Sequence, residues 1–249
     1  MASLSPEIIL HAGGFPITNT LISTLLVDLV IFSLIFAYTR RAALVPSGVQ
    51  SVFEPVIEYF YDLTTDIAGS KVKTIFPWFA SFFFFIVFAN LIALLPGFGT
   101  IGFWHTLSEG GKKTKELVPV LRAATSDFNV TLALGAVSII ATHIIAIRYN
   151  GFFGYIKKFL SLNPIYLFIG LLEFCLELVK IFSLSFRLFG NIFAGEVVLA
   201  TVAGLFAFIA PIPFLLLEVI VAIVQSLVFA MLTMVFMSLL ATTQSEGGH

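Results

Sequence analysis

The residues of this chain that could do chemistry are charged side chains standing inside long apolar runs. Two of them, Arg187 and Glu196, lie in SFRLFGNIFAGE, residues 185–196. A charge at the centre of a bilayer raises the free energy by at least ~2.5–3.5 kcal/mol, so such groups are paired, hydrated or kept for a function. The two long apolar segments at the end of the chain contain six such charged residues: Glu173, Glu177, Lys180, Arg187, Glu196 and Glu218.

Helical geometry sorts these side chains, because an α-helix turns by about 100° per residue. Ser183, Arg187 and Asn191 fall along one stripe. Glu173 lies about 40° from that stripe, whereas Glu196 lies about 180° from Arg187, on the opposite face. The sequence therefore predicts a cationic face and an acidic face on one helix.

The next apolar segment adds a glutamate and an amide, Glu218 and Gln225. In an antiparallel hairpin with its turn near residues 206–207, Arg187 and Gln225 lie at one level. Glu196 and Glu218 then share a level about nine residues nearer the turn. This arrangement predicts a deep site with a cation and an amide, reached by an acidic, hydrated path from the side of the turn.

Arg187 has two interpretations. The structural one is a buried ion pair with a glutamate of the same chain that holds two helices together. We favour the other, in which the partner carboxylate belongs to another chain, because an amide lies at the level of Arg187 across the hairpin. Arginine suits that role since it keeps its proton when buried.

The elements that must position these groups are membrane helices. Of 249 residues, 59% are hydrophobic and 11% are charged, whereas soluble domains are ~45–50% apolar. The apolar runs are long enough for helices rather than barrel strands. A net charge of −1 gives no indication of a nucleic-acid partner. We predict an all-α integral membrane protein, a single domain over residues 1–249 with about five crossings.

The first half of the chain divides by its apolar runs. Residues 17–39 form a first crossing, and residues 75–95 and 128–147 form two more, with a polar loop at 96–127. In residues 47–69, apolar positions recur at helical spacing while acidic positions follow another face. That pattern predicts an amphipathic helix at the membrane surface.

Two apolar segments at the end of the chain, residues 164–206 and 211–243, exceed one perpendicular crossing. At ~1.5 Å per residue they are much longer than a ~30 Å bilayer core. Neither interior contains a break signal, so we predict two long, strongly tilted helices that form a hairpin.

Basic residues predict the orientation, because loops on the inner side are enriched in Lys and Arg. With the N-terminus outside, the inner side receives seven basic residues and the outer side four. We therefore expect the N-terminus outside and the C-terminus inside. The inner residues are Arg40, Arg41, Lys71, Lys73, Arg148, Lys157 and Lys158, and the outer ones Lys112, Lys113, Lys115 and Arg122.

Several motifs together resemble one known family. They are ITNTL (17–21), VPSGVQSVFE (45–54), NLIALLPG (90–97), ATSDFNVTLALG (124–135), SLSFRLFGNIFAGE (183–196) and the PIP…E…Q…LVFAMLTMVF tail (211–236). Over nearly its whole length the chain resembles subunit a of the F-type ATP synthase, the stator subunit of the proton-translocating membrane sector.

This resemblance implies a rotary motor. Its partners are a ring of small membrane subunits, each with a buried carboxylate, and the membrane subunit of the peripheral stalk. Arg187 matches the essential arginine, which attracts the ring carboxylate, promotes proton release and separates two offset half-channels. Gln225 matches the glutamine opposite it. Glu196 matches an acidic relay group of the outer half-channel, with Glu218 beside it.

The resemblance also assigns polar positions along the route. Asn191 and Asn90 match polar channel positions, and Glu173 and Ser183 match positions at the inner half-channel or the ring-facing surface. Many members have a histidine at one of the two relay positions, whereas this chain has Glu196 and Glu218. Two adjacent carboxylates should share a proton. They could also coordinate Na⁺, although we expect H⁺ to be the transported ion.

Other residues keep two interpretations. Asp28 is either solvated near a channel mouth or hydrogen-bonded in its protonated form. Asp127 either caps the helix that follows or lines the channel. For His143 we favour a packing role over a proton carrier. Lys180 is placed to neutralise either Glu173 or Glu177.

Two rival classes have weaker support. A self-contained secondary ion transporter would usually show two related halves with broken helices, and a redox subunit would show histidine pairs; the sequence has neither. We expect no cofactor, no metal and no nucleotide chemistry in this chain. Residues 1–16 show no signal-peptide or presequence pattern. We therefore expect the bacterial plasma (inner) membrane rather than the mitochondrial inner membrane.

Overall fold

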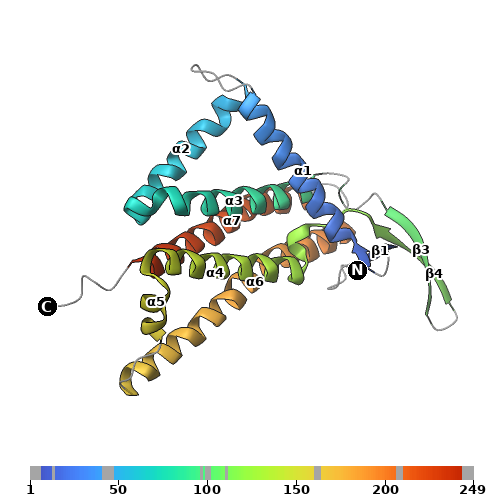
Figure 1. Cartoon of the computed structure of the whole chain (residues 1–249). Coiled ribbons are helices and arrows are strands. Elements are labelled where there is room, and N and C mark those ends of the chain that lie inside the picture. The colour runs from blue at the N-terminus through green and yellow to red at the C-terminus, as the bar shows by residue number, and fades with distance from the viewer. Residues whose placement is uncertain are drawn as a thin grey trace. The chain divides into compact units, whose positions relative to one another are not determined.

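The computed structural model describes residues 7–12, 15–40, 48–95, 98, 102–109, 112–159, 164–205 and 210–242. Residues 47, 206, 207 and 243, at the predicted ends and turn, lie outside this part. Within it the chain has seven α-helices (Figure 1). They are α1 (Asn19–Arg40), α2 (Val49–Ala68), α3 (Val72–Ala93), α4 (Phe128–Asn150), α5 (Phe152–Phe159), α6 (Pro164–Leu205) and α7 (Pro211–Ala241).

The described residues also form two short antiparallel sheets of two strands each. β1 (Ile8–Ala12) pairs with β2 (Phe15–Thr18) directly before α1. β3 (Gly102–Glu109) pairs with β4 (Lys112–Pro119), from Gly102 opposite Pro119 to Glu109 opposite Lys112. The segment predicted to be a polar loop therefore contains a hairpin. The chain reverses between Glu109 and Lys112, so neighbouring strands satisfy each other's backbone groups locally.

Four segments of the described residues are long and apolar enough to cross a membrane. They are Asn19–Arg40, Gln50–Ala93, Phe128–Asn150 and Pro211–Ala241. The predicted class, an all-α membrane protein, is confirmed. The highly charged α6 is not among the four, so the predicted count of about five crossings is approximate.

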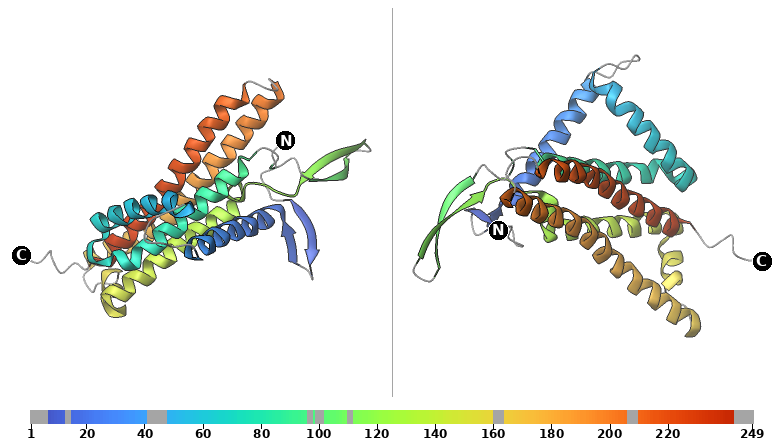
Figure 2. Two further views of the ribbon diagram at one scale, coloured as in Figure 1. Left: turned by 90° about the horizontal axis from the view of Figure 1, so that it is seen from above. Right: turned by 180° about the vertical axis from the view of Figure 1, so that it is seen from behind.

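The chain divides into two compact units. The first contains Met1–Arg40, Phe84–Val130 and Leu188–Ser226. Its apolar core centres on the buried side chains of Val27, Ala89 and Ala124. In this unit the end of α6 and the start of α7 run side by side (Figure 2), and the Asn191 amide donates a 2.7 Å hydrogen bond to Oε1 of Gln225.

The second unit contains Arg41–Phe83, Thr131–Arg187 and Leu227–His249. Aromatic packing joins α2 to α3, because the Phe60 ring lies 5.3 Å from that of Phe79 and 4.7 Å from that of Phe83. Helix ends meet through polar contacts. The Asn150 amide donates to the carbonyl of Leu240 at 2.8 Å, and Lys71 donates to Thr242 Oγ1 at 3.2 Å.

A short helix, α5, lies between α4 and α6, in a stretch for which no element was predicted. Gly151 precedes it in the left-handed region with φ 73°, which glycine adopts without steric strain. Its N–H still bonds to the carbonyl of Ile147 at 2.9 Å, which ends α4. The chain therefore changes direction at one residue and restarts as a helix.

Candidate functional site: a buried polar cluster around Glu196

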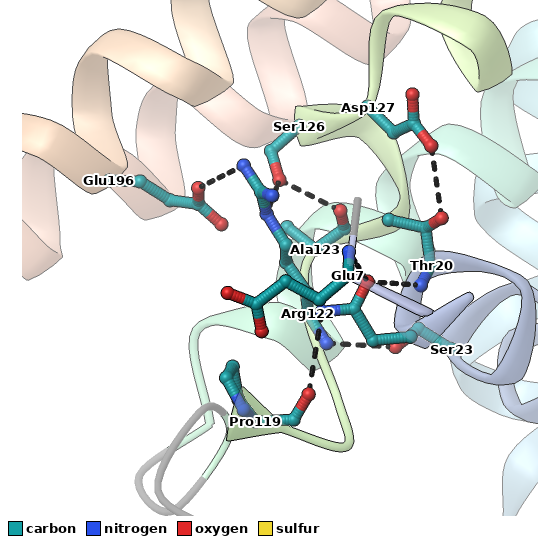
Figure 3. Close-up of polar contacts among 10 residues, drawn as sticks. Glu7, Thr20, Ser23, Pro119, Arg122, Ala123, Ser126, Asp127 and Glu196 are labelled. Atoms are coloured by element: carbon teal, nitrogen blue, oxygen red, sulfur yellow. Dashed lines mark hydrogen bonds and ion pairs between the residues drawn. The ribbon is translucent and has the colours of Figure 1, made fainter. Parts of the chain in front are cut away.

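A cluster of polar side chains lies in the first unit, where α6 meets the segment before α4 (Figure 3). Nη2 of Arg122 lies 3.8 Å from Oε2 of Glu196, and their side chains are 9% and 27% exposed. Nε of Arg122 donates to Oγ of Ser126 at 3.1 Å, while that hydroxyl donates to the carbonyl of Ala123 at 2.9 Å. The guanidinium is thus bonded to Ser126 as well as paired with the Glu196 carboxylate.

The segment before α4 is also hydrogen-bonded to the start of α1. The backbone N–H of Arg122 donates to Oγ of Ser23 at 3.0 Å, and the Asn19 amide donates to the carbonyl of Pro119 at 3.4 Å. Asn19 and Ser23 are one helical turn apart, so they present one face of α1 to this segment. These bonds fix the backbone on which Arg122 stands.

Asp127 performs the capping role that the sequence left open. Its Oδ1 accepts the N–H of Asn129 at 2.9 Å, which satisfies a free backbone donor at the start of α4. Its Oδ2 accepts the hydroxyl of Thr20 at 3.0 Å. One carboxylate therefore both caps α4 and ties it to α1 (Figure 3).

Asn90 is buried, with 2% of its surface exposed. Its side-chain oxygen accepts a hydrogen bond from the hydroxyl of Thr125, in the short 3₁₀ turn Ala124–Ser126 before α4. Among the described residues its Nδ2 has no hydrogen-bond partner. A buried amide with a free donor is suited to bind water.

The two glutamates of the predicted outer site belong to this unit. Glu218 is buried at 8% exposure, and its carboxylate packs so closely on Gly195 that a Cβ there would overlap it. The charge of Glu196 acts on Glu218. The structure therefore brings Glu196 and Glu218 together across the α6–α7 hairpin.

Arg187 lies on an exposed face of α6, together with Ser183 and Asn191. In the part of the chain that the structure describes, its guanidinium makes no hydrogen bond or ion pair. Gln225, 5% exposed, accepts its hydrogen bond from Asn191, one turn beyond Arg187 on α6. The intrachain ion pair considered for Arg187 is absent from the described residues.

The second unit holds the other charged groups of α6. Lys180 donates to Oε1 of Glu177 at 2.6 Å, so of its two candidate partners it is bonded to Glu177. Glu173 is half-buried, one turn earlier. Nδ1 of His143 lies 2.8 Å from the hydroxyl of Tyr155, so this histidine has a polar partner.

Two further residues singled out for their chemistry, Asp28 and Cys175, lie on exposed helix faces. Asp28 lies on an exposed face of α1. Cys175 is exposed on α6. Within the described residues no group of three His, Cys, Asp or Glu side chains could hold a metal ion.

Arg122 was expected as a charge of the outer loop, and its pairing with Glu196 was not predicted. The available signal was its position two residues before the ATSDFN motif and four residues before Ser126. No periodicity links it to α6, because the two segments are far apart in the chain.

Comparison with known proteins extends these observations. The family model described as ATP synthase A chain matches residues 20–238. ATP synthase subunit a of Moorella thermoacetica is 32% identical over 238 residues, covering 96% of this chain and 97% of that protein. The chain belongs to the ATP synthase subunit a family. The resemblance found in the motifs is thereby confirmed.

Other subunit a relatives cover similar lengths. The protein of Legionella pneumophila strain Paris is 29% identical over 227 residues, covering 91% of this chain and 87% of its own length. A Propionigenium modestum protein named as the sodium ion specific subunit a is 32% identical over 226 residues, covering 90% and 74%. Membership in this family, with the apolar helices, makes the chain a multi-pass membrane subunit that serves ATP synthesis and ion transport.

Proposed function

We propose that this chain is the stator of a rotary ATP synthase and presents two offset proton half-channels to a ring of small subunits, each with a buried carboxylate. The carrying observation is Arg187, which is exposed and makes no ion pair within the described residues. A guanidinium in low-dielectric surroundings needs a counter-ion. A carboxylate on the moving ring supplies it.

The outer half-channel runs past Glu218 and Glu196. Its support is the packing of the Glu218 carboxylate on Gly195, the residue next to Glu196, and the burial of Glu218. Two adjacent carboxylates share a proton readily, which suits a relay. A proton from outside passes these groups and neutralises a ring carboxylate. Asn191, Gln225 and Asn90 supply polar groups along the route.

The inner half-channel accepts the proton after the ring has turned. The neutral ring site faces lipid at small free-energy cost, because burial penalises the charged form most. Near Ser183 and Glu173 the positive field of Arg187 favours the charged carboxylate, so the proton leaves. Each proton crossing 100 mV releases ~2.3 kcal/mol. Arg187 stands between the two routes and prevents a direct leak.

The proposed setting is a bacterial inner membrane, with the N-terminus outside and the C-terminus in the cytoplasm. The excess of Lys and Arg on the inner loops supports this orientation. The second proposed partner is the membrane subunit of the peripheral stalk. Single cysteines at Ser70 and Ile8, each introduced together with Cys175→Ser and labelled from one side of intact cells at a time, test the orientation. Ile8→Cys should react from outside and Ser70→Cys from inside only.

The deciding experiment is Arg187→Ala in the assembled complex, with ATP-driven pumping and passive proton leak measured separately. We expect pumping to be lost and the leak to rise. Arg148→Ala is the matched control, since Arg148 is an exposed arginine near the end of α4, and it should keep both properties. Intact pumping in Arg187→Ala would overturn the proposal.

A second candidate is the Na⁺-coupled version of the same subunit. Two observations favour it. The Glu218 carboxylate packs on Gly195, directly before Glu196 in the chain, and a relative named as sodium ion specific is 32% identical. ATP-driven uptake of ²²Na⁺ into vesicles in the presence of a protonophore distinguishes the ions. Uptake that persists identifies Na⁺, and uptake that is absent identifies H⁺. A self-contained transporter would move ions in liposomes without the ring, whereas the stator should not.

A further inference from the structure

Glu177 is a buried acid that the proposed mechanism does not use. Only 3% of its surface is exposed. One oxygen, Oε1, accepts a 2.6 Å hydrogen bond from Lys180. The other, Oε2, is buried and has no hydrogen-bond partner among the described residues. A buried charged acceptor without a hydrogen bond is unfavourable, so an unpaired carboxylate oxygen of this kind calls for an explanation.

Lys180 provides a partner for only one of the two oxygens of Glu177. Its Nζ lies 4.5 Å from the centre of the Phe236 ring, and its side chain is 27% exposed. The ammonium is therefore held between Oε1 of Glu177 and an aromatic face. This geometry orients the carboxylate and keeps Oε2 turned away from the cation.

A second polar pair lies close enough to Glu177 to sense its charge. The hydroxyl of Tyr155 and Nδ1 of His143 are 2.8 Å apart. The charges of Glu177 and Lys180 act on His143, and those of Glu177 and Glu173 act on Tyr155. Burial, and then the Glu177 and Glu173 carboxylates, raise the pKa of Tyr155, so its hydroxyl stays protonated and able to donate.

The position of Glu177 on α6 relates it to Arg187. The two belong to the same unit and the same helix. Glu177 is ten residues nearer the start of α6, a distance of about 15 Å along the axis, and about 80° around it. In the proposed orientation this is the inner side of Arg187. Glu177 is buried among helices, whereas Arg187 is exposed.

We propose that Glu177 is a proton-transfer residue of the inner half-channel, with Lys180 as its positioning residue and the His143–Tyr155 pair as the next group toward inner water. The ring carboxyl loses one proton, Glu177 gains it on Oε2, and the pair hands it to solvent. No bond between heavier atoms changes. This inference rests on the proposed function.

The test measures passive proton conduction through the assembled membrane sector in vesicles stripped of the catalytic head, driven by a potassium diffusion potential. Glu177→Gln should lower conduction by about tenfold or more, as loss of a proton-transfer group does. Glu177→Asp should restore part of it. Glu58→Gln, which removes an exposed carboxylate on α2, is the control and should conduct normally.

A purely structural ion pair must be separated from a relay. The double variant Glu177→Gln/Lys180→Gln removes both charges and leaves no unpaired ion. If the pair is only structural, the double variant recovers conduction relative to Glu177→Gln, and the inference is overturned. If Glu177 transfers protons, conduction stays low although the subunit assembles. Should Glu177→Gln alone fail to assemble, the double variant decides.

The outcomes also separate the inference from the function on which it rests. Normal conduction in Glu177→Gln, together with lost pumping and raised leak in Arg187→Ala, overturns only the role of Glu177. Intact pumping in Arg187→Ala overturns the stator proposal itself.

Discussion

The guanidinium of Arg122 lies 3.8 Å from the carboxylate of Glu196 and joins α6 to the segment before α4. Ser126 accepts a hydrogen bond from the guanidinium and Ser23 accepts one from the backbone N–H of Arg122, so both the side chain and the backbone of Arg122 are held in place. A guanidinium held in this way can orient the Glu196 carboxylate. This contact distinguishes Glu196, which has an intrachain cation, from Arg187, which has no ion pair among the described residues.

Arg122→Ala should weaken the fold of the first unit. Breaking a buried ion pair leaves a partly buried charge, and with Glu196 27% exposed we expect a loss of about 2 kcal/mol. The temperature at which the detergent-solubilised complex releases this subunit measures the effect. Arg122→Lys should lose less, and Arg148→Ala should lose nothing. A release temperature unchanged in Arg122→Ala would contradict this prediction.

Gly195→Ala should disturb the outer acidic site without preventing assembly. A Cβ there would overlap the carboxylate end of Glu218, a flexible group that can move away. Alanine favours the helix by ~1 kcal/mol over glycine, so stability should hold while ATP-driven pumping falls several-fold. Gly204→Ala on the same helix is the control, because nothing lies within 4 Å of its Cβ position. Equal pumping in the two variants would refute the role of the Gly195 contact.

Gly135→Ala should destabilise the second unit. Its Cβ would lie 2.9 Å from the backbone carbonyl oxygen of Ile181 and would also overlap Oγ of Ser185. Backbone cannot move aside cheaply, so overpacking of ~1–3 kcal/mol should exceed the helix preference for alanine. The amount of assembled subunit in membranes measures this. Gly154→Ala, whose Cβ would lie 3.9 Å from the nearest atom, should assemble normally.

Gln225→Leu should lower pumping with little change in assembly. It removes the acceptor of the 2.7 Å bond from Asn191, but Asn191 is exposed and can bind another group. Pumping by vesicles with matched amounts of the complex is the measurement. Thr233→Val provides the opposite case on the same helix. It deletes a buried bond to Ser138 and should lose about 1 kcal/mol of stability while pumping persists.

The membrane class and the α6–α7 hairpin were accessible from the sequence because lipid removes most alternatives. Backbone groups in a bilayer must be satisfied within the segment, so a long apolar run is a helix. Counting residues from the turn then places Glu196 and Glu218 at one level of a hairpin, and in the structure the Glu218 carboxylate packs on Gly195, the neighbour of Glu196. The same reasoning put Arg187 and Asn191 on one stripe, which is exposed.

Other features could not be predicted from the sequence, because the spacing of residues along the chain carries no signal for them. Lys180 had two partners at helical spacing, and only packing selected Glu177. The β3–β4 hairpin and α5 are short, with strands and a helix of eight residues each, so neither apolar length nor periodicity is informative there.

By itself the sequence determined that this is a helical membrane protein of the subunit a family and which faces carry its charges, because apolar length and helical period act within single segments. Only the tertiary structure decided that Arg122 binds Glu196, that Asp127 ties α4 to α1, and that Glu177 is buried with one free oxygen. These contacts join residues through packing between segments, which depends on loops and side-chain fit rather than on any local pattern.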